Sequence, residues 1–434
     1  MFGYYLDLAL RSLKRNKALT TLMVLAIALG IGASMTTLTV LHVLSGNPLP
    51  DKGAHVYYPQ IDPQDERGYR PGEEPPGQLT WIDAMNLLHA GRGHYQAAMT
   101  GGSVPVQSTA GAIDPFFEGA RYTTAGFFPM FEVPMRYGSA WSAQDDADSA
   151  RVAVLSNELN DKLFGGADST GRSVRLNGAD FRVVGVLGDW HPNPHFYDLF
   201  TGSYDADEGV FVPLTTATDL KFGHDGNMHC WGDGGGEQGD LKTATCSWLQ
   251  FWVQLDTPAK AADYKAFLVH YSQQQKKLGR FQRDPNVRLR DLMAYLDFNK
   301  VVPSDVHLQV YLAFGFLLVC LVNTVGLLLA KFLRRGGEIG VRRALGASRR
   351  AVFAQLLIEA GIVGLVGGVL GLLLALAGLW LVRQQPSGYA VLAHLDPAML
   401  LTTFLLALCA SLLAGLLPAW RACQIAPALQ LKSN

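Results

Sequence analysis

The residues that could carry chemistry in this sequence are a few histidines, acids and cysteines. His191 and His195 stand four residues apart, the spacing of a helical metal pair, but prolines lie between them and exclude a helix there. We therefore interpret this stretch as a rigid exposed turn. His224 and His229 could bind a metal beside Cys230 only if that cysteine were free.

The acids and the short motifs give no sign of an active site. Asp145, Asp146 and Asp148 are interpreted as a solvated turn rather than a catalytic pair. The 434 residues contain no Gly-Lys dipeptide, which excludes a P-loop, and no HExxH or GxSxG motif. We therefore expect a non-catalytic chain with no metal and no cofactor of its own.

Two of the five cysteines are predicted to pair. Cys230 and Cys246 are the only cysteines between residues 45 and 305, in a Gly-rich polar stretch. If this part of the chain lies in an oxidising compartment, a disulfide between them is expected; two free thiols are the alternative. The other three cysteines fall in or beside apolar runs and are interpreted as small core residues.

The charge distribution divides the chain into two parts. Residues 45–305 contain 22 Lys/Arg and 33 Asp/Glu, a net charge of 22 − 33 = −11, and the remainder carries 14 − 4 = +10. Most of that positive charge flanks apolar segments. This pattern predicts a membrane protein with one large soluble domain, in contact with lipid and not with nucleic acid.

Four apolar segments are long enough to cross a bilayer. Because basic residues flank their ends at 11–17, 331–350 and 421–432, both termini and the 331–351 connection are predicted to be cytoplasmic. A cleaved signal peptide is the alternative for the first segment, which is long for that role. The predicted organisation is an amphipathic interfacial helix at 1–18, spans at 19–44, 306–330, 352–382 and 398–420, an external domain at 45–305, an external connection at 383–397 and a tail at 421–434.

The connection between the second and third spans contains the sequence EIGVRRALGAS at 338–348. Seven basic residues lie between 331 and 350 against one acid, Glu338. We predict a short helix in which Glu338 pairs with Arg342, Ile339 and Leu345 share one side with Ala344, and Gly346 ends the helix. Ser348 is predicted to cap the next helix. A retained topology signal is one interpretation of this basic helix, and a docking element for a cytoplasmic partner is the other.

Small residues recur at intervals of four in two spans. Ala26, Gly30 and Ser34 form such a series in the first, and Gly364 and Gly368 in the third. This spacing lets membrane helices approach closely, within one chain or across a dimer. Glu359, in the third span, must face protein or water, or reach the interface.

The sequence pattern of residues 45–305 is typical of an α+β domain. Strands are predicted at 152–155, 174–176, 181–187 and 250–255, with a hairpin turn at Asn177-Gly178, and helices at 158–164 and 261–278. The expected fold class is therefore membrane α-helical, with four transmembrane helices and a large α+β extracytoplasmic domain between the first and second.

The residues also resemble a known family, the MacB/FtsX-like ABC permeases of the macrolide-exporter and lipoprotein-release type (type VII architecture). The similarity is carried by ALRSLKRNKALTTLMVLAIALGIG near the N-terminus, by TTAGFFPMFEVPMRYGSAW and RVAVLSNELNDKLFGG in the external block, and by EIGVRRALGASRRAVFAQLLIEAGIVGLVGGVLG and GLLPAWRACQIAP near the C-terminus. It covers nearly the whole chain, without a fused ATPase domain.

The resemblance implies a bacterial inner-membrane permease whose ATP and Mg²⁺ are bound by a separate ATPase subunit. ATP-driven motion of the spans would be transmitted to the periplasmic domain and would serve export, efflux or extraction of a substrate. Other expected partners are a second identical or related permease, and a periplasmic adaptor and outer-membrane channel. The external block would be porter-like with an inserted β-rich lobe at about 120–245. The coupling residues would be Glu338, Ile339, Arg342, Arg343, Leu345 and Gly346.

Two other functions compete with transport. A regulatory permease of the same family would control a periplasmic hydrolase or sense a ligand. A membrane-anchored external enzyme would instead show activity in residues 45–305. The loop at 221–248 with its two cysteines departs from the family pattern and is a candidate for a specific contact.

Overall fold

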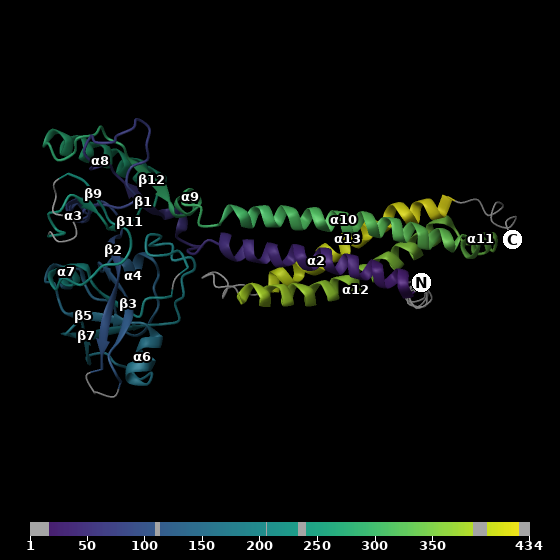
Figure 1. Cartoon of the computed structure of the whole chain (residues 1–434), viewed down its shortest axis with the longest axis horizontal. Helices are drawn as coiled ribbons and strands as arrows, with labels where there is room; N and C mark the ends of the chain where they lie inside the picture. Colours follow the sequence, from purple (N-terminus) through teal and green to yellow (C-terminus); the bar gives the residue numbers. More distant parts are fainter. Residues whose placement is uncertain (1–16, 109–112, 205, 233–239, 385–396, 425–434) are drawn as a thin grey trace. The chain divides into compact units, whose positions relative to one another are not determined.

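The computed structural model describes residues 17–108, 113–204, 206–232, 240–384 and 397–424. The chain divides into two compact units, residues 1–46 with 302–434 and residues 47–301 (Figure 1). The amphipathic helix predicted at 1–18, the connection at 383–397 and the tail at 421–434 lie almost entirely outside the described residues.

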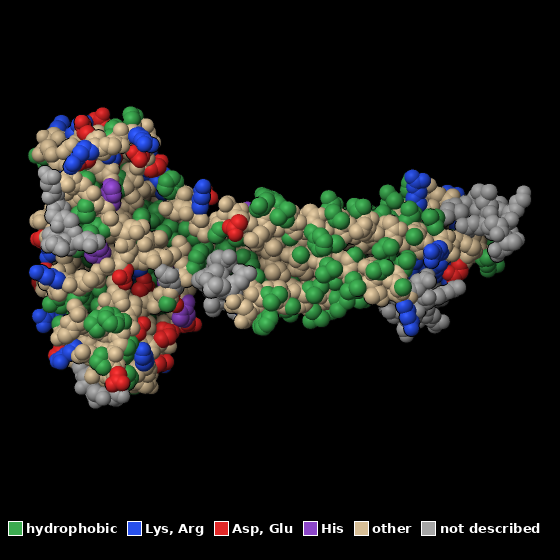
Figure 2. Space-filling view, in the orientation of Figure 1, with side chains coloured by type: hydrophobic (Ala, Val, Ile, Leu, Met, Phe, Trp, Pro, Cys, Tyr) green, Lys and Arg blue, Asp and Glu red, His purple; other side chains and the backbone are tan. Residues whose placement is uncertain are grey.

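The first unit is a bundle of long apolar helices. Four of them are long and apolar enough to cross a membrane, with mean hydropathies of 2.0 to 2.5. Together with the α/β domain they confirm the predicted fold class. Their exposed surface is rich in Leu, Val and Phe, which Figure 2 shows along the bundle. The helices are α2 (Lys17–Ser45), α10 (Ser304–Arg334), α12 (Arg349–Arg383) and α13 (Pro397–Gln424), with the short α11 (Gly336–Ala344) between α10 and α12.

Glycines set the close packing of these helices. A Cβ at Gly30 would lie 2.8 Å from Leu317 Cδ1, and Ser34 Oγ donates to a carbonyl of α10 at 3.2 Å. Gly364 and Gly368 face α13, where a Cβ would overlap Ser411 in the first case and lie 2.6 Å from a methyl carbon in the second. These neighbours all belong to the same chain. Ala26, at the start of the first series, is half-buried.

The second unit is built on a ten-stranded mixed sheet in the order β12-β1-β11-β2-β3-β8-β5-β7-β4, with β6 pairing to β2 and β7. The strands are β1 (Val56–Gln60), β2 (Gln96–Gln107), β3 (Phe116–Thr123), β4 (Met135–Gly138), β5 (Val152–Leu155), β6 (Ser173–Leu176), β7 (Ala179–Leu187), β8 (Val210–Pro213), β11 (Gln250–Gln254) and β12 (Arg288–Asp291). The sheet runs without a break into the region 120–245, so the boundary of an inserted lobe there stays a prediction.

Both faces of the sheet are buried, because successive side chains of a strand point to opposite faces. In β11, Phe251 joins one apolar cluster and Trp252 the other. The first cluster includes residues of α3 (Trp81–Ala90) and α8 (Pro258–Lys277), and the second includes residues of α4 (Phe127–Met130) and α9 (Leu292–Phe298). Because both faces of β11 are buried, the segment QFWVQL at 250–255 carries apolar side chains at consecutive positions, without the polar alternation of a half-exposed strand.

Several local predictions are confirmed. β6 and β7 form an antiparallel hairpin, and Asn177 and Gly178 take φ values of 47° and 81°, as a type I′ turn requires. The predicted helices appear as α6 (Asn157–Phe164) and α8. Remaining short elements are η1 (Gly53–His55), α5 (Ala143–Ala147), α7 (Leu214–Asp219), β9 (His229–Cys230) and β10 (Cys246–Ser247).

The predicted disulfide is present. Cys230 and Cys246 are bonded, and their strands β9 and β10 pair in a small separate sheet. Because Cys230 is in this bond, the metal site considered at His224 and His229 loses its thiolate ligand.

Candidate coupling site in the helix bundle

The helix α11 begins just after α10 and is a separate element because of the residues at its ends. Gly346 has a φ of 101°, a left-handed conformation that glycine adopts without strain, and α11 ends before it. Ser348 Oγ then accepts from Ala351 N at 3.2 Å and caps α12. The helix stop and the cap therefore follow the sequence prediction.

Arginines attach α11 to its neighbours in the bundle. Arg342 Nη1 donates to Gln355 Oε1 of α12 at 2.9 Å, and Arg343 Nη1 donates to the Cys423 carbonyl of α13 at 3.2 Å. Both arginines are half-buried. A displacement of α11 would therefore pull on two membrane helices through directional, charge-assisted hydrogen bonds.

The prediction of an ion pair between Glu338 and Arg342 is wrong. Glu338 Oε2 instead pairs with Arg335 at 3.0 Å, one turn earlier, while Arg342 turns to Gln355. The physical reason is burial: the half-buried Arg342 needs a partner on the bundle, and a solvent-exposed ion pair on one helix is worth only about 0.3–0.5 kcal/mol.

A buried charge cluster lies beside this helix. The side chain of Glu359 in α12 is completely buried. Its carboxylate accepts from Lys331 Nζ at 2.7 Å and from Arg335 Nη1 at 2.9 Å. Lys331 is itself fully buried, whereas Arg335 is 16% exposed and also contacts Glu338. Of the options left open for Glu359, the structure selects burial against protein. This cluster links α10, α11 and α12.

The opposite side of α11 is exposed and apolar. The side chains of Val341 and Leu345 are 49% and 83% exposed, and Ala344 lies with them. Arg349 and Arg350 are exposed at the start of α12, and Figure 2 shows Lys and Arg at this end of the bundle. The combination is an apolar stripe (Val341, Ala344, Leu345) beside exposed positive charge.

The structure divides the six predicted coupling residues into two groups. Ile339 packs against the bundle core, and Arg342 and Arg343 bind neighbouring helices, so these three face inward. Leu345 and, in part, Glu338 face outward, and Gly346 ends the helix. The expectation that Ile339 and Leu345 share a side is therefore wrong. Six residues advance about 600° around a helix, which is 240° beyond one full turn, so Ile339 and Leu345 lie on different faces.

The external unit holds a second buried charge cluster, which sequence reasoning missed. Arg121 of β3 is 1% exposed and forms ion pairs with Asp198 and Glu208. Tyr197 Oη donates to Glu208 Oε2 at 2.6 Å. Burial favours the protonated form of Glu208, but the charges of Arg121 and His195, together with the hydrogen bonds from Tyr197 and Arg121, outweigh it and lower the pKa of that carboxyl. These residues have no shared sequence motif that could have indicated the cluster.

The interpretation of His191 and His195 as an exposed turn is half wrong. His191 is exposed, but His195 is 3% exposed, and both rings bind the carboxylate of Asp207. For His195, burial disfavours the charged ring, yet the bond to Asp207 and the nearby Glu208 raise its pKa. The bond to Asp207 also raises the pKa of His191.

The acids at 145–148 are likewise not a simple solvated turn. Ser142 caps the short helix α5 there, and Asp146 accepts from Ala125 N at 2.7 Å and from Trp141 Nε1 at 2.8 Å. Burial raises the pKa of Asp146 to about 6, against the effect of those two donors. The carboxylate connects the segment 141–146 to Ala125 and has a structural role.

Comparisons with known proteins agree with this architecture. A family described as the MacB-like periplasmic core domain matches residues 20–269, and one described as the FtsX-like permease C-terminal domain matches residues 310–427. The pyoverdine export ATP-binding/permease protein PvdT of Pseudomonas entomophila is 25% identical over 83% of this chain and 50% of its own length. The macrolide export ATP-binding/permease protein MacB of Azoarcus sp. is 26% identical over 69% of this chain and 40% of its own length.

The chain thus spans about half the length of the curated relatives it matches. Among solved structures, the periplasmic region of MacB from Actinobacillus actinomycetemcomitans is 14% identical and covers 58% of this chain and 95% of its own, with a TM-score of 0.35. Because the two family matches together cover most of the sequence, with four membrane helices around an external α/β domain, the chain belongs to the MacB/FtsX-like ABC permeases of the bacterial inner membrane.

Proposed function

We propose that this chain is the permease subunit of an ABC transporter and that α11 is its coupling helix. In this proposal a separate ATPase binds ATP and Mg²⁺, contacts α11 from the cytoplasm and drives export, efflux or extraction of a substrate by the periplasmic domain. A second permease, identical or related, would complete the membrane part. The printed names of the relatives, which describe export, support the transport class.

One observation carries the proposal: the two sides of α11 differ. The inner side is attached through Arg342 and Arg343 to α12 and α13, and the outer side exposes Val341 and Leu345. A topology signal needs only positive charge. It needs neither an exposed apolar stripe nor hydrogen bonds to two membrane helices, both of which a force-transmitting joint requires.

The α2 and α10 helices provide the path to the periplasm in this proposal. In sequence, α2 ends immediately before the external domain and α10 begins immediately after it. Movement of either helix would therefore be delivered through a covalent connection. The described spans contain few polar residues, which favours mechanical transmission over a conduit for a polar substrate.

The test is co-purification with the candidate ATPase and measurement of ATP turnover in nanodiscs. Leu345→Asp should weaken ATPase association, because it places a charge in the apolar contact. Leu278→Asp, at a leucine of the external domain that is 71% exposed, is the matched control.

Arg342→Ala combined with Arg343→Ala should give a different result. The ATPase should still associate, because the outer side of α11 is unchanged, but the permease should no longer alter its turnover. If the ATPase binds and turns over normally with all three changes, α11 is not the joint. If no ATPase associates with the unaltered chain, the permease assignment itself loses support.

A further inference from the structure

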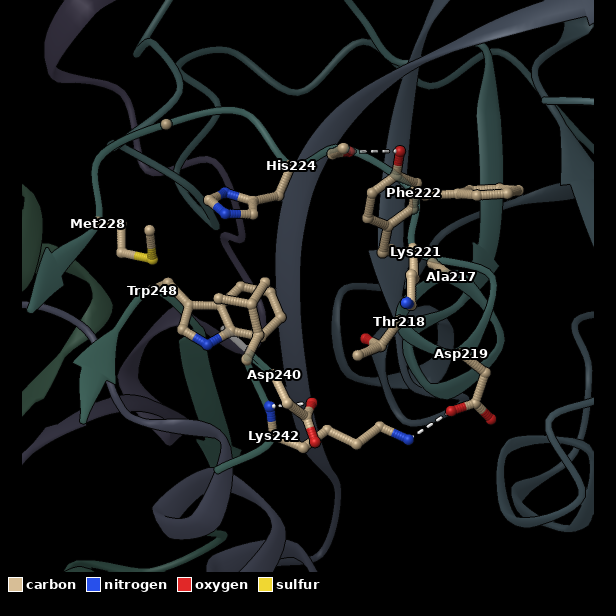
Figure 3. A pocket seen from close by; sticks show the side chains of 14 residues that line it. Ala217, Thr218, Asp219, Lys221, Phe222, His224, Met228, Asp240, Lys242 and Trp248 are labelled. Carbon is tan, nitrogen blue, oxygen red and sulfur yellow. Dashed lines mark hydrogen bonds and ion pairs between the residues drawn. The ribbon is translucent and has the colours of Figure 1, made fainter. Parts of the chain in front are cut away.

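A pocket in the external unit has the size and lining of a small-molecule site. It encloses about 950 Å³ between α7, the segment 221–228 and the segment 240–248 (Figure 3). This volume is at the upper end of the range of ligand sites. The disulfide Cys230–Cys246 joins the two segments beyond the pocket and limits how far they can separate.

Part of the pocket wall is aromatic. Trp248 and Phe222 are buried and line it, and Figure 3 shows them on either side. Trp248 is held in place by stacking on Trp81, at a centroid distance of 6.2 Å. Its indole N–H is buried and has no acceptor among the described residues, so the wall contains an unsatisfied donor.

Two acids and two lysines line the pocket, and one of the lysines has no ion-pair partner among the described residues. Lys242 pairs with Asp219, which also accepts from Ser149 Oγ at 2.7 Å, and Asp240 Oδ1 accepts from the Lys242 backbone N–H at 3.0 Å. Asp219 is therefore neutralised by Lys242, whereas Asp240 accepts a backbone hydrogen bond and keeps its charge. The exposed Lys221 lines the pocket and forms no ion pair with any described residue.

The backbone at Lys221 adds to this picture. Its φ is 55°, the left-handed region that a non-glycine residue seldom adopts. Nearby Asp225 and His224 are the other ionisable groups of this segment, and the ring of His224 lies tilted against Trp248 at a centroid distance of 5.3 Å. The conformation ends helix α7, where the Lys221 N–H donates to the Thr218 carbonyl and the Phe222 N–H to the Ala217 carbonyl, and it fixes the backbone of Lys221 beside the pocket.

The geometry points to a binding site for small aromatic anions, in which the ring packs between Trp248 and Phe222 and the anionic group meets Lys221. The site belongs to the external unit and to the loop that departs from the family pattern. Its test requires no ATPase, so failure of the coupling proposal leaves this inference standing, and the reverse also holds.

The experiment is isothermal titration of the full chain in nanodiscs with 1-naphthalenesulfonate, after subtraction of binding to empty nanodiscs. We expect saturable binding with a dissociation constant below about 1 mM. Methanesulfonate, which lacks the ring, and 1-naphthylmethylammonium, which has the opposite charge, should each bind at least about tenfold more weakly.

Two matched variants separate this site from adventitious binding. Lys221→Glu should weaken 1-naphthalenesulfonate binding by about tenfold or more, while Lys265→Glu, at an exposed lysine of α8, should change it by less than about twofold. Unchanged thermal unfolding of both variants would show that they fold. No saturable binding, equal effects of the two variants, or tighter binding of the cationic probe would overturn the inference.

Discussion

Replacing Glu359 by leucine should destabilise the helix bundle more than any other single change in its charge cluster. Glu359 is the only acid that Lys331 contacts among the described residues, and both side chains are completely buried. Removing the carboxylate leaves the ammonium of Lys331 buried without a counter-ion. Arg335 keeps its pairing with Glu338 and remains partly exposed, so Lys331 accounts for most of the loss.

The expected magnitudes follow from which charge is left alone. Removing one partner of a buried ion pair costs about 3–5 kcal/mol, which we expect for Glu359→Leu. Lys331→Leu should cost less, about 1.5–3 kcal/mol, because Glu359 still accepts from Arg335 at 2.9 Å. The double variant removes both buried charges and should lie within about 1 kcal/mol of the unaltered chain.

The bundle contains its own probe for this measurement. Cys320 is 5% exposed, and with Cys409 and Cys423 changed to alanine it is the only reduced cysteine, because Cys230 and Cys246 are bonded. Labelling of Cys320 by a maleimide during a titration with sodium dodecyl sulfate in detergent micelles reports opening of the bundle. Equal stability of Glu359→Leu and the unaltered chain, or a double variant as unstable as Glu359→Leu, would refute the reasoning.

Three further predictions concern packing, the disulfide and pH. Gly364→Ala should cost about 1–3 kcal/mol in the same labelling assay because its Cβ overlaps a helix α13 side chain, whereas Gly326→Ala, which meets no atom within 4 Å, should cost nothing. Changing Cys230 and Cys246 to serine should lower the free energy of unfolding of the external unit by about 3 kcal/mol in a urea titration; no change would mean that the loop is ordered without its bond. The raised pKa of His195 means that its charged form stabilises the fold below the unfolded pKa of about 6.5 and that this contribution is lost as pH rises through the folded value. Hydrogen exchange of residues 195–208, corrected for intrinsic rates, should therefore show more opening at pH 8 than at pH 6, with a smaller difference in His195→Gln.

The parts of this fold that sequence reasoning predicts well are those fixed by local patterns. Long apolar runs with basic ends predict the spans, because a continuous helix satisfies its backbone hydrogen bonds within a single segment in lipid. The Asn177-Gly178 pair gives its hairpin, because both residues tolerate a positive φ. Gly346 and Ser348 give the helix stop and start for the same kind of local reason.

The parts that it misses depend on residues far apart in the chain. Arg121 meets Asp198 and Glu208 across 77 and 87 residues, and no spacing rule connects them. The prolines beside His195 favour an exposed turn, but the burial of its ring is decided by the fold around Asp207. A buried charge needs a partner of opposite charge, but the sequence does not show which residue that partner is.

The case of Arg342 shows why the candidate site needed the structure. On an isolated helix, Glu338 four residues before Arg342 is a favourable pair. In the bundle, the same arginine gains more by binding Gln355, and Glu338 moves to Arg335, which in turn holds Glu359. A Glu338–Arg342 pair internal to α11 would have removed the hydrogen bond from Arg342 to Gln355 of α12. The arrangement observed instead connects α11 to the buried charge cluster, so in the proposed coupling a load applied at Leu345 would reach α12 through side chains that are costly to separate.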